Sequence, residues 1–407
     1  MLNVKTPPQA MQIIKDNFGR LNLPVESVSL NQALGRTLAQ DIISQEFVPA
    51  FDRSMVDGFA VMAADTFGCS ETIPAMLDNK GEVLMGQGAS ITITKGQAVY
   101  VPTGGQIPRG ADAMVMIEYT EDYDDGLIYI QKPSAPGQHI SFKGDDIKPG
   151  ELILKAGKVI KAKDIGALAA LGYQEINVRQ RPKIGIISTG DELIDITETP
   201  KNSQIRDINS SMLAAAIAAL AGEPLLLGII RDKYDLLKSA ITANIDDCDM
   251  LLISGGSSVG SRDVTYKVLD DLGDKGVLLH GIAIKPGKPT IVGSVKGKPV
   301  FGLPGHPVSA YFIFHLFVRP LIYALLGNSY QDHSIYAKMI TNLPSNHGRE
   351  EYVAVALENS SQGLIVRPII SKSGMISVLS QADGYIKIDR DCEGIDKDSR
   401  VEVFLFS

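Results

Sequence analysis

The hydrophobic pattern of the first third of the chain changes from helical to strand-like spacing. Apolar residues recur every three or four positions over residues 7–19, which predicts an amphipathic helix, and residues 25–30 alternate as a strand does. Residues 50–140 are rich in Gly, Pro and Thr and contain alternating runs at 89–94 and 98–101. This region is therefore expected to form a small β-rich domain.

The middle of the chain alternates short apolar runs with helical patterns. Residues 158–172 and 210–221 are predicted helices, and Asn209 or Ser210 is available as the N-cap of the second. The apolar runs have the length and branching of buried parallel strands and lie at 183–187, 250–253 and 299–301. Strands alternating with helices in this way predict a doubly wound α/β domain.

The longest apolar stretch, residues 308–326, is long enough to resemble a membrane span. His315, Arg319 and Pro320 interrupt it, and it follows a strand and a Gly-rich turn, so a buried helix is expected. Beyond Gly327 the pattern shortens to predicted strands, which indicate a terminal all-β domain, at 352–357, 364–368, 385–388 and 400–406.

Three Gly-rich turns follow predicted strands, at residues 188–192, 254–263 and 302–310. Ligands of open α/β sheets bind beyond the carboxyl ends of the strands. Glycine lets the backbone approach a phosphate or oxyanion closely, and the neighbouring carboxylates can hold a divalent cation. The turns are thus expected to form one site for a nucleotide or a phosphorylated cofactor.

Composition narrows the class of protein. A chain of 407 residues predicts several domains, and 39 basic against 47 acidic residues, a formal charge of −8, disfavours a nucleic-acid scaffold. Cys69, Cys248 and Cys392 are too widely spaced for a disulfide framework or a zinc motif. Residues 1–20 show no secretory signal. A cytoplasmic protein without membrane or nucleic-acid partners is expected.

The order and spacing of several short motifs give the chain a specific resemblance. These motifs are Leu34–Arg36, Arg53–Ala60, Pro102–Gly105, Ala111–Met116, Gly144–Ile147, Lys285–Pro289 and Gly305–Ser309. In this order they resemble the MoeA family of molybdopterin molybdenumtransferases, which is related to the E domain of gephyrin. The resemblance covers nearly the whole chain.

The resemblance implies that adenylylated molybdopterin and molybdate react to give molybdenum cofactor and AMP, assisted by magnesium. It implies a homodimer in which the site lies between the α/β domain of one protomer and the small β domain of the other. An adenylyltransferase is a possible partner. The protein would hold molybdate against the dithiolene of the substrate and assist pyrophosphate cleavage, without a Cys or Ser nucleophile.

The resemblance also implies a multidomain α/β fold. Its central doubly wound domain, similar to MogA and MoaB, is expected at residues 181–326. An elongated N-terminal α+β domain used for dimerisation would combine 1–48 with 141–180, and the small β domain would be inserted at 49–140. A C-terminal β-barrel-like domain would occupy 327–407.

Four acidic residues match the family's catalytic positions: Asp57, Glu192, Asp232 and Asp263. Asp57, Glu192 and Asp263 are expected to hold the metal, because carboxylates brought together repel unless a cation compensates them. Judged from the neighbouring residues alone, Asp57 could simply cap a turn and have no role in the site. Asp191 and Glu192 could equally be the N-cap or first-turn acids of a following helix.

The resemblance places further residues around the pterin nucleotide. Thr103 follows a proline and precedes two glycines, which also suits a plain turn, and Asp146 could share its role with Asp145 or simply face water. The other residues expected at this part of the site are Ser188, Thr189, Gly190, Gly255, Gly256, Ser257, Gly260, Pro304 and Gly305.

Lys285 and Lys288 bracket a Pro-Gly turn and present two ammonium groups near free amides. A solvated basic loop is the commoner explanation of such a pattern. The resemblance makes these lysines, with Ser309 and Arg349, the molybdate pocket. Arg donates in a planar fork and Lys acts as a point charge, which together suit a tetrahedral dianion.

The sequence departs from the commoner family pattern at three positions. Ser257 stands where Val is frequent, His306 where Asn is frequent, and Ala354 where a second Arg is frequent. His306 adds a titratable group beside the expected oxyanion pocket and could bear on molybdate or tungstate choice. Two other functions stay open: a MogA-type adenylyltransferase, which would lack the flanking domains, and a non-catalytic pterin-binding scaffold.

Overall fold

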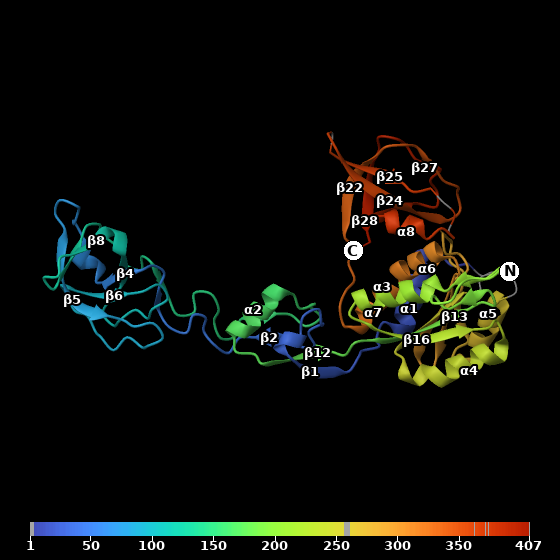
Figure 1. The fold of residues 1–407 in the computed structure, drawn as a ribbon, viewed down its shortest axis with the longest axis horizontal. Helices are drawn as coiled ribbons and strands as arrows, with labels where there is room; N and C mark the ends of the chain where they lie inside the picture. Colours follow the sequence, from blue (N-terminus) through green and yellow to red (C-terminus); the bar gives the residue numbers. More distant parts are fainter. Residues whose placement is uncertain (1–3, 256–260, 362, 371, 373, 407) are drawn as a thin grey trace.

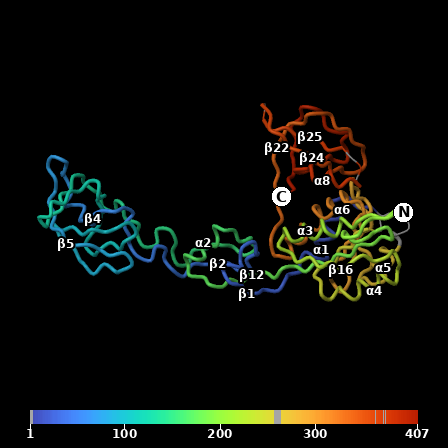
Figure 2. The backbone as a smooth tube through the Cα atoms, in the orientation of Figure 1, coloured from blue at the N-terminus to red at the C-terminus, as the bar shows by residue number. Residues whose placement is uncertain are grey.

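The structure is a computed structural model that describes residues 4–255, 261–361, 363–370, 372 and 374–406, with only the backbone described at 261–263. Figure 1 shows an elongated molecule with three parts. A β-rich distal lobe is joined by a narrow neck to a body, which contains the α/β domain and the C-terminal domain. Figure 2 shows the chain leaving the body, building the distal lobe and returning through the same neck.

The α/β domain is built on one sheet, whose spatial order is β16 (Glu223–Ile230), β13 (Lys183–Thr189), β17 (Met250–Gly255), β21 (Lys298–Leu303), β20 (Ile291–Val295) and β18 (Val277–His280). The first four strands are parallel to one another. At one edge of the sheet, β20 is antiparallel to β21, and β18 is antiparallel to β20. The covering helices are α1 (Pro7–Phe18), α3 (Ile208–Ala219), α4 (Tyr234–Asn244), α5 (Ser261–Leu272), α6 (Pro307–Ile313) and α7 (Arg319–Leu325).

Side-chain alternation along the strands explains why helices cover both faces of this sheet. Met250 and Leu252 of β17 belong to the core shared with α1, α3, α6 and α7, whereas Leu251 and Ile253 belong to the core shared with α4 and α5. A strand buried on both faces reads as a continuous apolar run. The predicted doubly wound domain is confirmed, and Figure 1 shows its two helical layers.

Helix α1 packs against the body. Thr6 and Gln9 form a capping box at its start, and Ala10, Ile14 and Phe18 are buried in the core with α3, α6 and α7. The chain enters the neck only after this helix (Figure 2). The described part of the segment 1–48, grouped above with the elongated domain, is thus divided between body and neck.

Two helix predictions in the α/β domain have different outcomes. The N-cap of α3 is Asp207, which accepts the Ser210 N–H, so the prediction of Asn209 or Ser210 was wrong by two or three residues. The apolar stretch forms α6, a π-helical turn (Phe314–Val318) and α7, and 72% of its most apolar window is buried inside the molecule. The predicted buried helix is confirmed.

The neck is a small α+β unit with its own core. It consists of β1 (Val25–Ser29) paired with β12 (Glu175–Arg179), β2 (Ile42–Ile43) paired with β11 (Leu152–Leu154), and α2 (Ala162–Ala170). Helix α2 begins four residues later than predicted because Asp164 accepts the Lys161 N–H and an ammonium hydrogen bond from Lys158. These contacts fix the helix start at residue 162.

The distal lobe contains a six-stranded sheet in the order β7 (Ala113–Met116), β4 (Gly58–Val61), β6 (Gln97–Val101), β5 (Ala75–Glu82), β9 (Leu127–Ile130) and β8 (Thr120–Asp122). A short pair, β3 (Arg53–Ser54) with β10 (Ile140–Ser141), connects it to the neck. The predicted β-rich domain is confirmed. The alternating run at 89–94, which contributed to that expectation, forms no strand. It carries an isolated bridge between Thr92 and Arg109, and the Gln106 side chain accepts the Ala89 N–H.

The C-terminal domain is a five-stranded barrel. Its strands are β24 (Glu350–Ser360), β25 (Gly363–Pro368), β22 (Ser334–Met339), β28 (Arg400–Leu405) and β26 (Gly384–Ile388), and pairing of β24 with β26 closes it. The remaining elements are β23 (Leu343–Pro344), β27 (Gly394–Ile395) and α8 (Ser377–Gln381). Each predicted C-terminal strand is found, which confirms the β-barrel-like expectation.

An aromatic cluster seats the barrel on the α/β domain. The ring of Phe312 lies 5.6 Å from that of Tyr385, and His315 lies 5.5 Å from Tyr385 and 5.3 Å from Phe406. Burial, together with the neighbouring Arg319 charge, lowers the pKa of His315 to about 3. In addition, β19 (Ile284–Lys285) of the α/β domain pairs with β24. The two domains therefore share both a core and a sheet.

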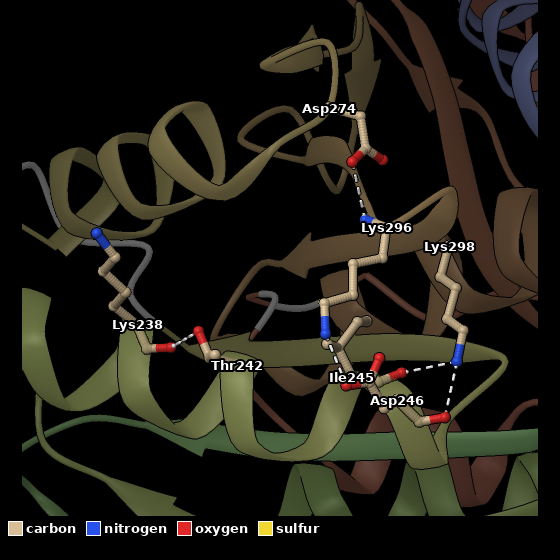
Figure 3. Close-up of polar contacts among 7 residues, drawn as sticks. All are labelled: Lys238, Thr242, Ile245, Asp246, Asp274, Lys296 and Lys298. Atoms are coloured by element: carbon tan, nitrogen blue, oxygen red, sulfur yellow. Dashed lines mark hydrogen bonds and ion pairs between the residues drawn. The ribbon is translucent and has the colours of Figure 1, made fainter.

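Two lysines at the β20–β21 turn bind the residues that directly follow helix α4 (Figure 3). The Lys298 ammonium donates to the carbonyls of Ile245 and Asp246, at 2.9 Å each, and Lys296 forms an ion pair with the Asp246 carboxylate at 2.6 Å. Cations at a helix C-terminus satisfy its last carbonyls and oppose its dipole. These contacts hold the end of α4 at the side of the sheet opposite the carboxyl ends of the parallel strands.

Candidate functional site

A cavity of about 830 Å³ opens at the carboxyl ends of β13 and β17. We call it the acidic cavity, because the charged residues in its described lining are three acids, Glu192, Asp207 and Asp232, and the basic residue Arg206. Gly305, also predicted for the site, lies on its wall. The structure thus brings together two of the predicted catalytic acids at the expected edge of the sheet.

Close backbone packing shapes the floor of the acidic cavity. The Thr189 hydroxyl donates a hydrogen bond to the Asp232 carboxylate, which joins the ends of β13 and β16. Gly255 has φ +116°, and a Cβ there would lie 1.9 Å from the Thr189 carbonyl oxygen. Only glycine permits this approach, so the glycine that ends β17 brings the second turn against the first.

Asn209 is a site residue that sequence reasoning missed. Its amide donates to the Ser254 hydroxyl at 2.9 Å and to the Gly305 carbonyl at 2.8 Å, which ties the second Gly-rich turn to the third. Two buried oxygens nearby, Asn209 Oδ1 and Ser188 Oγ, have no hydrogen-bond partner among the described residues. Its position at a helix start was the only available signal, and that signal indicated a cap.

Glu192 is exposed above the Gly190 turn. A Cβ on Gly190 would lie 2.9 Å from Glu192 Oε2, so the carboxylate folds back over this glycine. The following residues form a short strand, β14 (Leu193–Ile194), paired with β15 (Ile205–Arg206). Asp191 and Glu192 are therefore not the first-turn acids of a helix, and that alternative was wrong.

A second cavity, of about 750 Å³, lies between the α/β domain and the barrel. We call it the basic cavity; its charged lining is Lys285, Lys288, Arg349, Lys372 and one acid, Glu351. Ser309, in the first turn of α6, and Pro304 complete the group of predicted residues around it. The predicted oxyanion-binding residues thus surround one cavity, although they come from two domains.

Glu351, which the sequence analysis did not single out, neutralises one of these cations. Its side chain is only 11% exposed, pairs with the Lys285 ammonium at 2.5 Å and accepts the Ser345 hydroxyl at 2.7 Å. Lys288 and Arg349 form no ion pair with any described residue. The basic cavity therefore keeps a net positive charge at Lys288 and Arg349.

Among the residues that the structure describes, His306 lines both cavities. It is the exposed N-cap residue of α6, and its two neighbours, Gly305 and Pro307, both line the acidic cavity. The negative and the positive cavity thus meet at one imidazole. One of the three positions expected to depart from the commoner family pattern thus lies at the junction of the two cavities.

Asp57 and Thr103 lie together in the distal lobe. Strands β4 and β6 are antiparallel with Gly58 opposite Val101, so the residue before β4 meets the turn after β6. Asp57 Oδ1 accepts the Thr103 N–H at 2.8 Å, and both residues are exposed. A Cβ on Gly58 would lie 2.0 Å from the Val115 carbonyl, so glycine is required beside the aspartate.

Asp146 lies at the neck end of the distal lobe. Its N–H donates to the Val48 carbonyl, and its side chain is exposed, whereas the neighbouring Asp145 carboxylate accepts the Phe142 N–H. Asp145 is thus used to close the local turn. Asp146 is left facing outward, as a loop acid or as part of a site completed elsewhere.

The predicted site residues do not all meet within one chain. Asp57, Thr103 and Asp146 belong to the distal lobe and its neck, far from the cavities of the body (Figure 1). Among the described residues, no group of three His, Cys, Asp or Glu side chains is placed to hold a metal ion. Of the remaining predicted residues, Gly256, Ser257, Gly260 and the Asp263 side chain lie outside the described part.

Comparison with known proteins agrees with this architecture. Three family models match: the MoeA N-terminal region (domains I and II) at residues 6–172, a probable molybdopterin binding domain at 185–324, and the MoeA C-terminal region (domain IV) at 336–406. Together they cover the neck, the distal lobe, the α/β domain and the barrel.

Relatives match over nearly the whole chain. A molybdopterin molybdenumtransferase of Bacillus subtilis is 33% identical over 93% of this chain and 89% of its own, and one of Staphylococcus aureus is 30% identical over 94% and 92%. A crystal structure of a molybdopterin biosynthesis MoeA protein from Pyrococcus horikoshii is similar with a TM-score of 0.87 and 38% identity, covering all of both chains. The chain belongs to the MoeA family of molybdopterin molybdenumtransferases, enzymes of molybdenum cofactor biosynthesis.

Proposed function

We propose that this protein inserts molybdate into adenylylated molybdopterin and releases AMP. The observation that carries the proposal is the meeting of two oppositely charged cavities at His306. The basic cavity suits a tetrahedral dianion, because Lys288 and Arg349 retain uncompensated charge there. The acidic cavity suits a divalent cation with the nucleotide end of the pterin, and together the cavities place the two substrates side by side.

The residues of the acidic cavity fit magnesium, which favours carboxylate and other oxygen ligands. Glu192 and Asp232 would hold it, and the unpartnered buried oxygens of Ser188 and Asn209 leave acceptor capacity at the same edge. A bound magnesium ion would neutralise charge on the pyrophosphate as its bond is cleaved. The oxygens of the substrate would complete a ligand set that one chain does not supply.

The residues of this chain act by holding the reactants. Lys288, Arg349 and Ser309 would fix molybdate at the domain boundary, while Asn209 holds the Gly305 turn against β17 so that both cavities keep their shape. Positioning two reactants converts a bimolecular step into an effectively unimolecular one. The dithiolene sulfurs belong to the substrate, so no nucleophilic side chain is needed.

The complete site is proposed to form between two subunits of a homodimer. Asp57 and Thr103 are exposed on a lobe that lies far from the cavities of its own body (Figure 1). In a twofold dimer the distal lobe of one subunit could lie against the body of the other. The adenylylated substrate would be supplied by an adenylyltransferase, a possible further partner.

The deciding experiment is AMP release from adenylylated molybdopterin with magnesium, with and without molybdate. We expect molybdate-stimulated release that Glu192→Gln reduces by about 10²–10³, the usual effect of removing one charge-stabilising group. Glu198→Gln is the matched control, because Glu198 is exposed in the nearby loop between β14 and β15 but does not line the cavity. Substrate binding without AMP release from the wild type would contradict the proposal and favour a pterin-binding scaffold.

The adenylyltransferase alternative makes the opposite prediction. Such an enzyme would form adenylylated molybdopterin from ATP and molybdopterin and would not consume molybdate. The MoeA-type models for both flanking regions support the transferase proposal over it. Molybdate and tungstate should be compared in the same assay, because His306 borders the basic cavity.

A further inference from the structure

A third cavity, of about 490 Å³, lies behind the basic cavity. We call it the outer cavity. The two cavities share Lys288, Arg349 and Ile284, so the same two cations face both spaces. The outer cavity adds Arg390 and His347, and none of its described lining residues is acidic.

Three segments that are distant in sequence form the walls of the outer cavity. The Lys5 N–H donates to the Gly281 carbonyl at 3.1 Å, and the Ala283 N–H donates back to Lys5 at 2.7 Å. The Glu350 N–H donates to Ala283 at 3.0 Å, which adds the first residue of β24 to the same ladder. Backbone pairing of this kind makes the cavity a fixed feature of the fold.

The charge of the outer cavity is poorly compensated. Arg390 pairs with Asp391 at 3.4 Å, and His347 pairs with Glu393 at 3.1 Å. Both carboxylates are 85% exposed, and water weakens the attraction in exposed ion pairs, so they offset little of the positive charge. The Gly348 N–H donates to the Arg390 carbonyl at 2.8 Å, which holds Arg390 beside the His347–Arg349 turn. Clustered like charges with this little compensation favour binding of an anion.

We propose that the outer cavity is a second oxyanion-binding site, which captures a tetrahedral dianion and passes it between Lys288 and Arg349 into the basic cavity. The inference rests on the proposed function, because it takes the basic cavity as the place where molybdate reacts. A cavity lined by charges of one sign raises the local concentration of the opposite ion. Lys288 and Arg349 already face both cavities. Transfer therefore requires only that the anion moves from one side of these two cations to the other.

The test is equilibrium dialysis of the full-length protein against radiolabelled molybdate without pterin. We expect two molybdate ions per chain in the wild type. Arg390→Gln should weaken one of the two sites by about tenfold, equivalent to about 1.4 kcal/mol, and leave the other unchanged. Arg367→Gln is the matched control, because Arg367 is also in an exposed ion pair of the barrel but lines none of the three cavities.

Ser309→Val separates this inference from the proposed function. Ser309 lines the basic cavity and not the outer one, so its loss should weaken the site that Arg390→Gln leaves unchanged. One ion per chain in the wild type, with Arg390→Gln equal to Arg367→Gln, would overturn the outer site and leave the proposed function standing. Binding that Arg390→Gln weakens and Ser309→Val does not would contradict molybdate binding in the basic cavity, and the transfer route with it. Circular dichroism melting checks that each variant is folded.

Discussion

The body and the distal lobe both carry predicted site residues, but they present them differently. In the body, residues from several strands, turns and two domains surround cavities of about 750 and 830 Å³. In the distal lobe, Asp57 and Thr103 are exposed and joined by one hydrogen bond across neighbouring strand ends. The body therefore has the form of a binding site, whereas the distal lobe offers residues to a surface outside itself.

The strongest test of this difference is Asp57→Asn. If the distal lobe completes a site on another subunit, AMP release should fall by about 10²–10³, as for loss of a charge-stabilising group. Molybdate binding should be unchanged, because the basic cavity belongs to the body. The rate and the dialysis constant measure the two effects. Asp78→Asn, in an exposed ion pair of the same lobe, is the control, and equal rates for both variants would remove Asp57 from the site.

Mixing two inactive variants sharpens the comparison. Asp57→Asn and Glu192→Gln change different regions, so a mixed dimer would have one site with both changes and one with neither. Random exchange of subunits should therefore restore roughly a quarter of the wild-type AMP release. Each variant exchanged with itself provides the baseline. A mixture that stays at that baseline would show that the two regions do not form a shared site.

Asn209→Ala tests how the body holds its cavities together. The change leaves the Ser254 hydroxyl and the Gly305 carbonyl without their amide donor, which costs about 1–3 kcal/mol when such groups are buried. We expect AMP release to fall about tenfold, since 1.4 kcal/mol corresponds to a factor of ten. Asn244→Ala is the control, because Asn244 donates to the Ala240 carbonyl, away from both cavities. Unchanged kinetics would make Asn209 dispensable.

Acid should loosen the body and not the distal lobe. Burial lowers the pKa of His315 to about 3, so between the unfolded value near 6.5 and pH 3 only the unfolded state binds the proton. The stability present above pH 6.5 is therefore lost as the pH falls, by about 1.4 kcal/mol per pH unit. Hydrogen exchange of amides in α6 and β26 at pH 7 and 5, corrected for intrinsic rates, measures this loss. His315→Gln should abolish the difference, while distal-lobe amides should show none in either protein.

The smallest effect is expected at the far face of the α/β domain. Lys298→Met removes the ammonium that binds the carbonyls of Ile245 and Asp246 (Figure 3) and should lower stability by about 1 kcal/mol. AMP release should be unchanged, because α4 ends away from both cavities. Thermal unfolding and the AMP assay measure the two outcomes. A large loss of activity would show that this face is coupled to the site.

Much of the fold follows from local pattern. The continuous apolar runs of β13, β17 and β21 predicted parallel strands, because strands of this kind are buried on both faces. The short apolar runs after Gly327 predicted strands of the barrel. Prediction failed where the structure of a segment depends on a strand partner or a side-chain hydrogen bond that the hydrophobic pattern does not report. Residues 89–94 alternate as a strand but lack a partner strand, and α3 is capped by Asp207 because that side chain reaches the Ser210 N–H.

The sequence by itself determined the residue types of the site. Glycines were expected beside the carboxylates and lysines beside the Pro-Gly turn, and the structure places Glu192, Asp232 and Gly305 in one cavity and Lys285, Lys288, Ser309 and Arg349 around another. Glu192, Asp232 and Gly305 follow the ends of β13, β16 and β21, and the carboxyl ends of parallel strands lie on the same side of a sheet. Local periodicity therefore located the strand ends, and the resemblance to the family identified which residues beside them belong to the site.

Only the tertiary structure decided how those residues are combined. Glu351 compensates Lys285 because β19 joins β24, a pairing between domains that no periodicity encodes. His306 separates a negative from a positive cavity because the barrel packs over one side of α6. Asp57 lies far from both cavities because the neck holds the distal lobe at a distance from the body (Figure 1). Charge compensation and contact depend on distances in space, whereas sequence patterns report only which face of an element is buried.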